Sequence, residues 1–137
     1  MNTHILTFGL LGVRALPCLA KPHTPAKGSK ERAAIMNALR PKLGSGRHKP
    51  LITADTLNVE RDWAFISGGF AHADGAPLEE EFQNGPGTGF EALLHREGGR
   101  WRVKRLVSAG DVQGLEFMRA FPRAPRALFF NARGEAL

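Results

Sequence analysis

Residues 91–108, EALLHREGGRWRVKRLVS, place the strongest constraint on the fold of this chain. Apolar and charged residues alternate after the Gly98-Gly99 pair, and glycine supplies the positive φ angles that a two-residue β-hairpin loop needs. We therefore predict two antiparallel strands joined by a tight turn, at the centre of a sheet. The second strand is expected to present two faces, Trp101, Val103, Arg105 and Val107 on one and Arg100, Arg102, Lys104 and Leu106 on the other.

The composition is that of one ordinary globular domain. The chain has 137 residues, of which 42% are hydrophobic and 23% charged. No stretch reaches the roughly 18 apolar residues of a transmembrane helix. The single cysteine, Cys18, precedes the expected domain, which therefore contains no disulfide, thiol nucleophile or thiolate ligand. We expect no cofactor and no metal site.

The positive charge is concentrated near the N-terminus. The net charge is +6, and residues 21–50 contain eight Lys and Arg against the single acidic residue Glu31. Such asymmetry can indicate contact with an anionic polymer or surface. A solvated basic arm explains it equally simply, and we favour that interpretation.

The first residues are typical of an exported protein. Residues 5–13 are mostly apolar and Ala20 precedes a plausible cleavage position, which predicts a signal peptide over 1–20 and a periplasmic or secreted location. Arg14 interrupts the apolar run, so a cytoplasmic N-terminus is the alternative. Residues 21–28, rich in Pro and Gly, are expected to be a linker, and residues 131–137 a tail.

The remaining pattern predicts one α+β domain over 29–130. Ser29 is expected to cap a helix that Pro41 ends after residue 40. Strands are predicted over 51–59 and 63–71, the first with Leu51, Thr53, Asp55, Leu57 and Val59 on one face. Gly68-Gly69 indicates a bulge or a close backbone approach. A long acidic and Gly-rich loop, 73–89, precedes the hairpin, and a short helix, 112–121, follows a cap at Asp111. We therefore expect an N-terminal helix packed on a bent antiparallel sheet of about four strands.

Several segments resemble a group of small, mostly exported bacterial proteins. The similar segments are KGSKERAAIMNALRP (27–41), RDWAFISGGFAHADGAPL (61–78), EALLHREGGRWRVKRLVSAGDVQGLEF (91–117) and APRALF (124–129). The resemblance implies a cystatin-like or NTF2-like α+β roll. It implies no activity and no catalytic residue, and residues 79–89 depart from the shared outline.

Only weak candidates for catalysis are present. Asp62 stands at a predicted turn and His72 lies near an acidic run, so either is a candidate general acid or base if it is buried in a pocket. An Asp at a turn more often binds nearby amides, and the His lacks the spacing of a zinc site. No Ser/His/Asp order indicates a hydrolase.

Aromatic and basic residues give two further candidate sites. The bent sheet and helix are expected to enclose either a solid core or a ligand pocket, with Trp63, Phe65, Trp101 and Val103 as lining candidates. Arg100, Arg102 and Lys104 form a basic stripe that single-stranded nucleic acid would require. Trp101 is expected to point to the opposite face, so a solvated outer face is favoured.

These observations favour an exported, non-enzymatic protein that binds a small ligand or an envelope protein. The alternative is a general acid/base enzyme of NTF2-like fold. A third hypothesis, association with nucleic acid through basic residues 21–49, is less favoured. A homodimer through the sheet or the C-terminal tail is compatible with the pattern.

Overall fold

The computed structural model describes residues 21–43, 50–75, 77, 89–108 and 114–137. Within these ranges the elements follow the order α1 (Lys30–Leu43), β1 (Pro50–Glu60), β2 (Trp63–His72), β3 (Gly89–Glu97), β4 (Arg100–Ser108), α3 (Gly114–Ala120) and the 3₁₀ helix η1 (Arg126–Phe129). The strands form an antiparallel sheet in the order β1-β2-β3-β4. The predicted α+β class and the four-stranded antiparallel sheet are confirmed. The cystatin-like or NTF2-like assignment stays a prediction.

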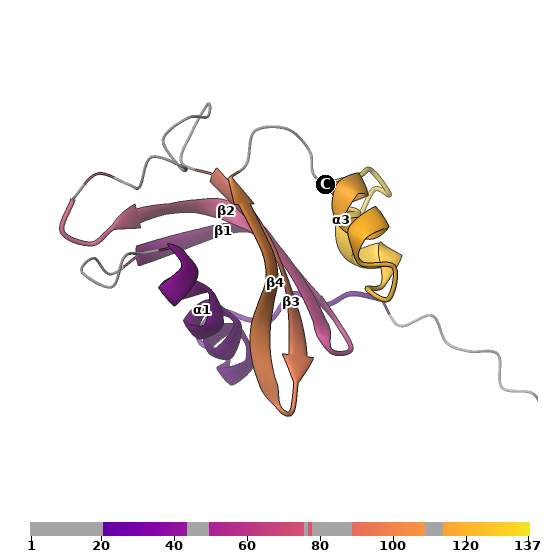
Figure 1. Cartoon of the computed structure of the whole chain (residues 1–137), viewed down its shortest axis with the longest axis horizontal. Helices are drawn as coiled ribbons and strands as arrows, with labels where there is room; N and C mark the ends of the chain where they lie inside the picture. Colours follow the sequence, from indigo (N-terminus) through magenta and orange to yellow (C-terminus); the bar gives the residue numbers. More distant parts are fainter. Residues whose placement is uncertain (1–20, 44–49, 76, 78–88, 109–113) are drawn as a thin grey trace, which may run out of the picture.

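Helices cover both faces of the sheet. In Figure 1, α1 lies on one side of β4 and α3 on the other. The core is accordingly divided into two clusters of buried side chains. The α1-side cluster includes Ile35, Leu39, Ile66, Leu94 and Trp101. The α3-side cluster includes Phe65, Leu93, Phe117, Leu128 and Phe129.

A β-bulge in β1 corrects the predicted alternation of that strand. The pairing passes from Ala54 opposite Gly68 to Thr56 opposite Ser67, so Asp55 is an extra residue. An extra residue reverses which side chains face the core. Ile52 and Ala54 therefore pack in the same α1-side cluster as Leu57 and Val59. The prediction that residues 51, 53, 55, 57 and 59 share one face was therefore wrong.

A second bulge corrects the prediction for β4. Leu93 pairs with Arg105 and Leu94 with Val103, which leaves Lys104 as the extra residue. Trp101 and Val103 share one face, as predicted, and this face packs against α1. Leu106, which was predicted on the opposite face, packs in the same α1-side cluster. Arg105 and Val107 lie on the α3 side.

Gly68 marks a close approach between two backbones. A Cβ built at this position would lie 2.0 Å from the Thr53 carbonyl oxygen. The extra residue that sequence placed near Gly68-Gly69 is instead Asp55 on the neighbouring strand. The predicted close backbone approach is therefore confirmed at Gly68, whereas the bulge lies on β1.

Helix α1 begins as predicted and ends later. The backbone N–H of Arg32 donates to Ser29 Oγ at 3.2 Å, which is an N-cap bond. The helix continues through Pro41 to Leu43, so the predicted end at residue 40 was wrong. Proline removes one hydrogen bond of the last turn. The burial of Leu43, which is 0% exposed, offsets that loss.

The Ser29 cap gives a prediction for stability. We expect Ser29→Ala to lower the free energy of unfolding by about 1 kcal/mol, because the Arg32 N–H loses its acceptor. Urea unfolding followed by circular dichroism measures the change. Ser29→Asp, which keeps an acceptor at the cap, is the matched control and should remain near wild type. Equal losses in both variants would contradict the capping role.

The segments at the two ends of the domain also contact it. The backbone of His23 exchanges two hydrogen bonds of 2.8 Å with Val59 of β1, in the region expected to be a linker. In the expected tail, Ala136 forms a bridge with Phe130, and the Leu137 N–H donates to the Phe129 carbonyl at 2.8 Å. Both segments therefore lie against the sheet and its α3-side cover.

Some predictions lie outside the described residues. These are the signal peptide over 1–20, most of the 73–89 loop, and the proposed helix start at Asp111 and Val112. None of the helices described is both long and apolar enough to span a bilayer.

Candidate functional site

Asp62 occupies an exposed position between β1 and β2. Its Oδ1 accepts hydrogen bonds from Arg96 Nε at 3.0 Å and Nη2 at 2.8 Å. Its carbonyl also accepts from the Arg96 backbone N–H at 2.7 Å. These contacts join the β1–β2 turn to β3. The carboxylate is thus an exposed ion-pair partner, outside any enclosed pocket.

His72 lies at the other end of β2. The side chain is 4% exposed, and its ring centroid is 6.4 Å from that of Phe70. At about 3.3 Å per strand residue, roughly 30 Å separate it from Asp62. The two candidate acid/base residues therefore do not form one site.

The four predicted pocket residues divide between the two faces of the sheet. Trp63 and Phe65 pack in the α3-side cluster, whereas Trp101 and Val103 pack in the α1-side cluster. Phe65 is fully buried, with ring centroids 5.7 Å from Phe117 and 5.3 Å from Phe129. The sheet itself separates the two pairs, so they do not line a common cavity.

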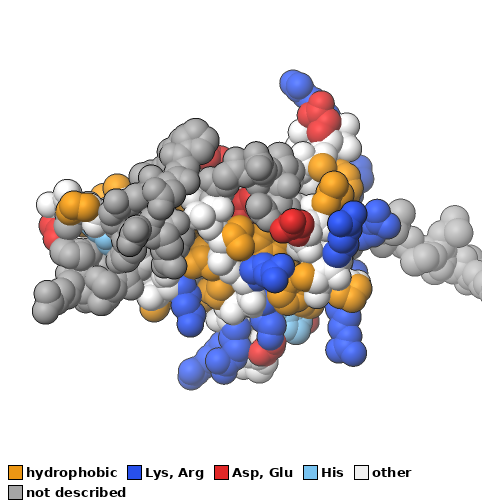
Figure 2. Space-filling model, turned by 45° about the horizontal axis from the view of Figure 1, so that its top comes forward, with side chains coloured by type: hydrophobic (Ala, Val, Ile, Leu, Met, Phe, Trp, Pro, Cys, Tyr) orange, Lys and Arg blue, Asp and Glu red, His pale blue; other side chains and the backbone are white. Residues whose placement is uncertain are grey.

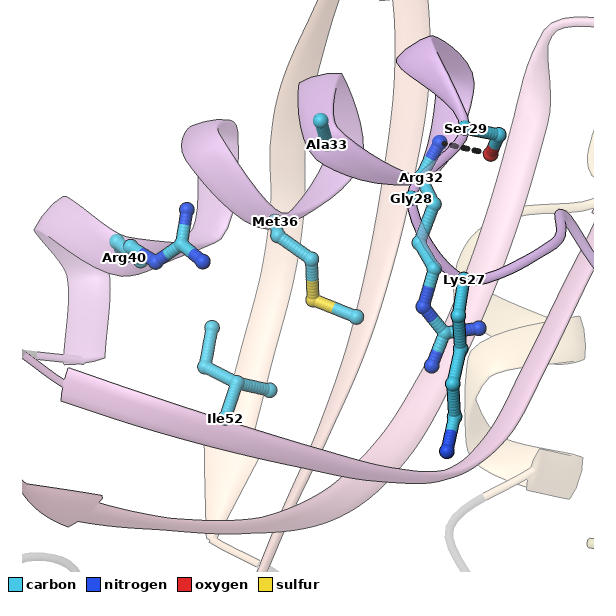
Figure 3. Close-up of a pocket in the computed structure, with 8 residues that line it drawn as sticks. All are labelled: Lys27, Gly28, Ser29, Arg32, Ala33, Met36, Arg40 and Ile52. Carbon is cyan, nitrogen blue, oxygen red and sulfur yellow. Dashed lines mark hydrogen bonds between the residues drawn. The ribbon is translucent and has the colours of Figure 1, made fainter.

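A groove between α1 and β1 brings together a different set of residues. It has a volume of about 340 Å³, and we call it the cationic groove (Figure 3). Its lining consists of Lys27, Gly28, Ser29, Arg32, Ala33, Met36, Arg40 and Ile52. Three of these residues carry a positive charge, and none is a carboxylate or an imidazole.

Helical spacing and a strand bulge build this groove. Arg32, Met36 and Arg40 follow one another at intervals of four residues, so they lie along one side of α1. Ile52 faces the same helix because the Asp55 bulge sets the orientation of the first half of β1. Figure 3 shows Met36 and Ile52 between Arg40 at one end and the Lys27 and Arg32 side chains at the other.

Local hydrogen bonds hold the two arginines. Arg32 Nη1 donates to the Pro25 carbonyl at 3.1 Å, which orients the guanidinium from the segment before the helix. Arg40 Nη1 donates to Asn37 Oδ1, while its buried Nε has no hydrogen-bond partner among the described residues. Fixed cations beside an apolar floor create a positive potential in a region partly shielded from water. Such a site can bind an anion.

The groove was not among the sites predicted from sequence. The concentration of basic residues in 21–50 was the available signal, and it correctly located the charge. It did not show that these cations line one groove with Ile52, because Ile52 faces α1 only as a result of the bulge at Asp55. Among the described residues, no three His, Cys, Asp or Glu side chains are grouped so as to hold a metal ion.

Comparisons with known proteins add no family to this picture. No protein-family model, no curated protein and no solved structure matches the chain.

Proposed function

We propose that the chain is a non-catalytic binding protein whose cationic groove holds a small anionic ligand with an apolar portion. The observation that supports this proposal is that three cations, Lys27, Arg32 and Arg40, line one groove that has no acidic lining residue. The chemistry is that of a carboxylate, sulfate or phosphate attached to a short apolar chain or ring.

The groove has two regions that suit the two parts of such a ligand. Lys27 and Arg32 lie side by side at one end, where they can contact an anionic group, and arginine does so with two parallel N–H donors (Figure 3). Met36 and Ile52 then provide apolar contact for the remainder. The volume of about 340 Å³ is at the lower end of the range for small-molecule sites.

The same lining disfavours catalysis. General acid/base chemistry needs a group that titrates near the working pH within hydrogen-bond reach of the substrate. The groove contains lysine and arginine but neither carboxylate nor imidazole. Asp62 and His72, the candidates for the enzymatic alternative, are not part of it. A binding role is therefore the better match to these side chains.

Titration calorimetry with octyl phosphate, below its aggregation concentration, tests the proposal. We expect Lys27→Gln and Arg32→Gln each to weaken binding about tenfold, because each removes one charged contact to the phosphate. Lys30→Gln is the matched control: it removes the same charge from the exposed side of α1 and should change affinity less than twofold.

Octanol provides the control for charge. It should bind far more weakly than octyl phosphate, since it lacks the anionic group. Equal binding of the two compounds would contradict the proposal. So would an equal loss in Lys30→Gln and Arg32→Gln, which would indicate a general effect of net charge. Thermal unfolding of each variant confirms that it remains folded.

A further inference from the structure

A second positively charged surface lies on the opposite side of the sheet. Its cations are Arg100, Arg102, Lys104 and Arg105 of β4. Arg102 pairs with His95 and Arg100 with Glu97, on the face away from buried Trp101. The Lys104 bulge turns Arg105 to this face as well. We call these four cations and the aromatic groups beside them the basic sheet face.

Only part of this charge is neutralised. Glu97 Oε1 accepts from Lys104 Nζ at 2.9 Å, and its Oε2 lies 3.6 Å from Arg102 Nε. The hydrogen bonds from Lys104 and then His95 lower the pKa of Glu97 below its ordinary value. Arg100 and Arg105 have no carboxylate within ion-pair distance in the part of the chain that the structure describes. Two cations therefore remain available to an external anion.

Aromatic rings adjoin the cations. The Trp63 and His95 ring centroids are 4.2 Å apart, and the Phe121 ring centroid lies 6.5 Å from that of Trp63. The Arg105 guanidinium lies 5.8 Å from the centre of the Phe121 ring. All three rings are half-buried, so their edges reach the surface. Figure 2 shows Lys and Arg side chains projecting beside exposed apolar surface.

We propose that the basic sheet face binds single-stranded nucleic acid. A single strand needs cations that follow its phosphates and aromatic side chains against which its bases stack. Trp63, His95 and Phe121 supply the rings, and β4 supplies the cations along one strand. This assignment places the contact on β4, away from the basic residues 21–49, and it is independent of the cationic groove.

Unstacked bases distinguish this partner from other polyanions. Duplex nucleic acid keeps its bases paired and would contact the cations alone. A polyphosphate chain has no rings for Trp63, His95 or Phe121 to contact. The proposal therefore requires that bases, and not charge alone, contribute to affinity.

Fluorescence anisotropy of labelled dT12 tests the proposal on the full chain. Log affinity should fall with log salt concentration at a slope of about −1.4, since Arg100 and Arg105 can each neutralise one phosphate and each neutralised phosphate of a single strand contributes about −0.7. Arg105→Gln should reduce the slope by about 0.7 and weaken binding several-fold. Lys30→Gln, with the same change in net charge on the α1 side, should leave both quantities nearly unchanged.

Three further probes decide the partner. A 12-residue abasic strand, a 12-base-pair duplex and polyphosphate should each bind at least fivefold more weakly than dT12. Equal affinity for any of them overturns the proposal, because bases would then be irrelevant. Absence of dT12 binding at low salt also overturns it. Lys27→Gln, which affects the cationic groove, should leave dT12 binding unchanged, so the two proposals succeed or fail separately.

Discussion

Replacing Gly68 with alanine is expected to destabilise the protein by about 3 kcal/mol, because the new methyl group has no space. Its Cβ would lie 2.0 Å from the Thr53 carbonyl oxygen and 3.0 Å from the Ala54 Cα. Both atoms belong to the β1 backbone, so no side-chain rotation relieves the contact. The two strands must separate locally, which disturbs the pairing of Gly68 with Ala54. Urea unfolding of the variant measures the loss.

Gly98→Ala separates steric overlap from backbone strain. Gly98 has a φ of +57°, and a Cβ built there meets no atom within 4 Å. Its substitution should cost only about 1 kcal/mol, the penalty for a side chain in the left-handed region. If the two variants lose equal stability, the close approach at Gly68 is not the cause.

Truncating Phe65 to alanine should produce the largest loss, about 4 kcal/mol of unfolding free energy. The side chain is 0% exposed, and its ring contacts both Phe117 of α3 and Phe129 of η1. Removing it leaves a cavity between the sheet and its α3-side cover. Chemical denaturation measures the loss of unfolding free energy. Relative to wild type, amide hydrogen exchange should accelerate more in α3 than in α1.

Leu115→Ala serves as the control for Phe65→Ala. Leu115 belongs to α3 but is 52% exposed, so its truncation should change stability by less than about 0.5 kcal/mol. A loss comparable to that of Phe65→Ala would mean that α3 contributes through its surface instead of through the buried rings. Uniform hydrogen exchange in α1 and α3 would equally contradict the expected local effect.

The two-sided core also separates the two proposed binding surfaces. The cationic groove rests on Met36 and Ile52 of the α1-side cluster, whereas Trp63 and Phe121 of the basic sheet face adjoin the α3-side cluster. A substitution near Phe65 that leaves the protein folded should therefore weaken dT12 binding more than octyl phosphate binding.

Local sequence determined the elements and their order. The Gly98-Gly99 turn specifies the β3–β4 hairpin, since both residues have positive φ angles of 57° and 77°. The Ser29 cap specifies the start of α1. The apolar spacing of Ile35, Met36 and Leu39 specifies which side of that helix is buried. Each of these outcomes depends on residues within one or two turns of one another.

Only the tertiary structure decided which side chains meet. The bulges at Asp55 and Lys104 arise from pairing with β2 and β3, and each reverses the alternation beyond it. They bring Ile52 to the cationic groove and Arg105 to Phe121. The separation of Trp63 from Trp101 likewise depends on two strands and two helices at once. A period-two pattern cannot show an inserted residue, because the insertion is stabilised by the neighbouring strand and not by the sequence around it.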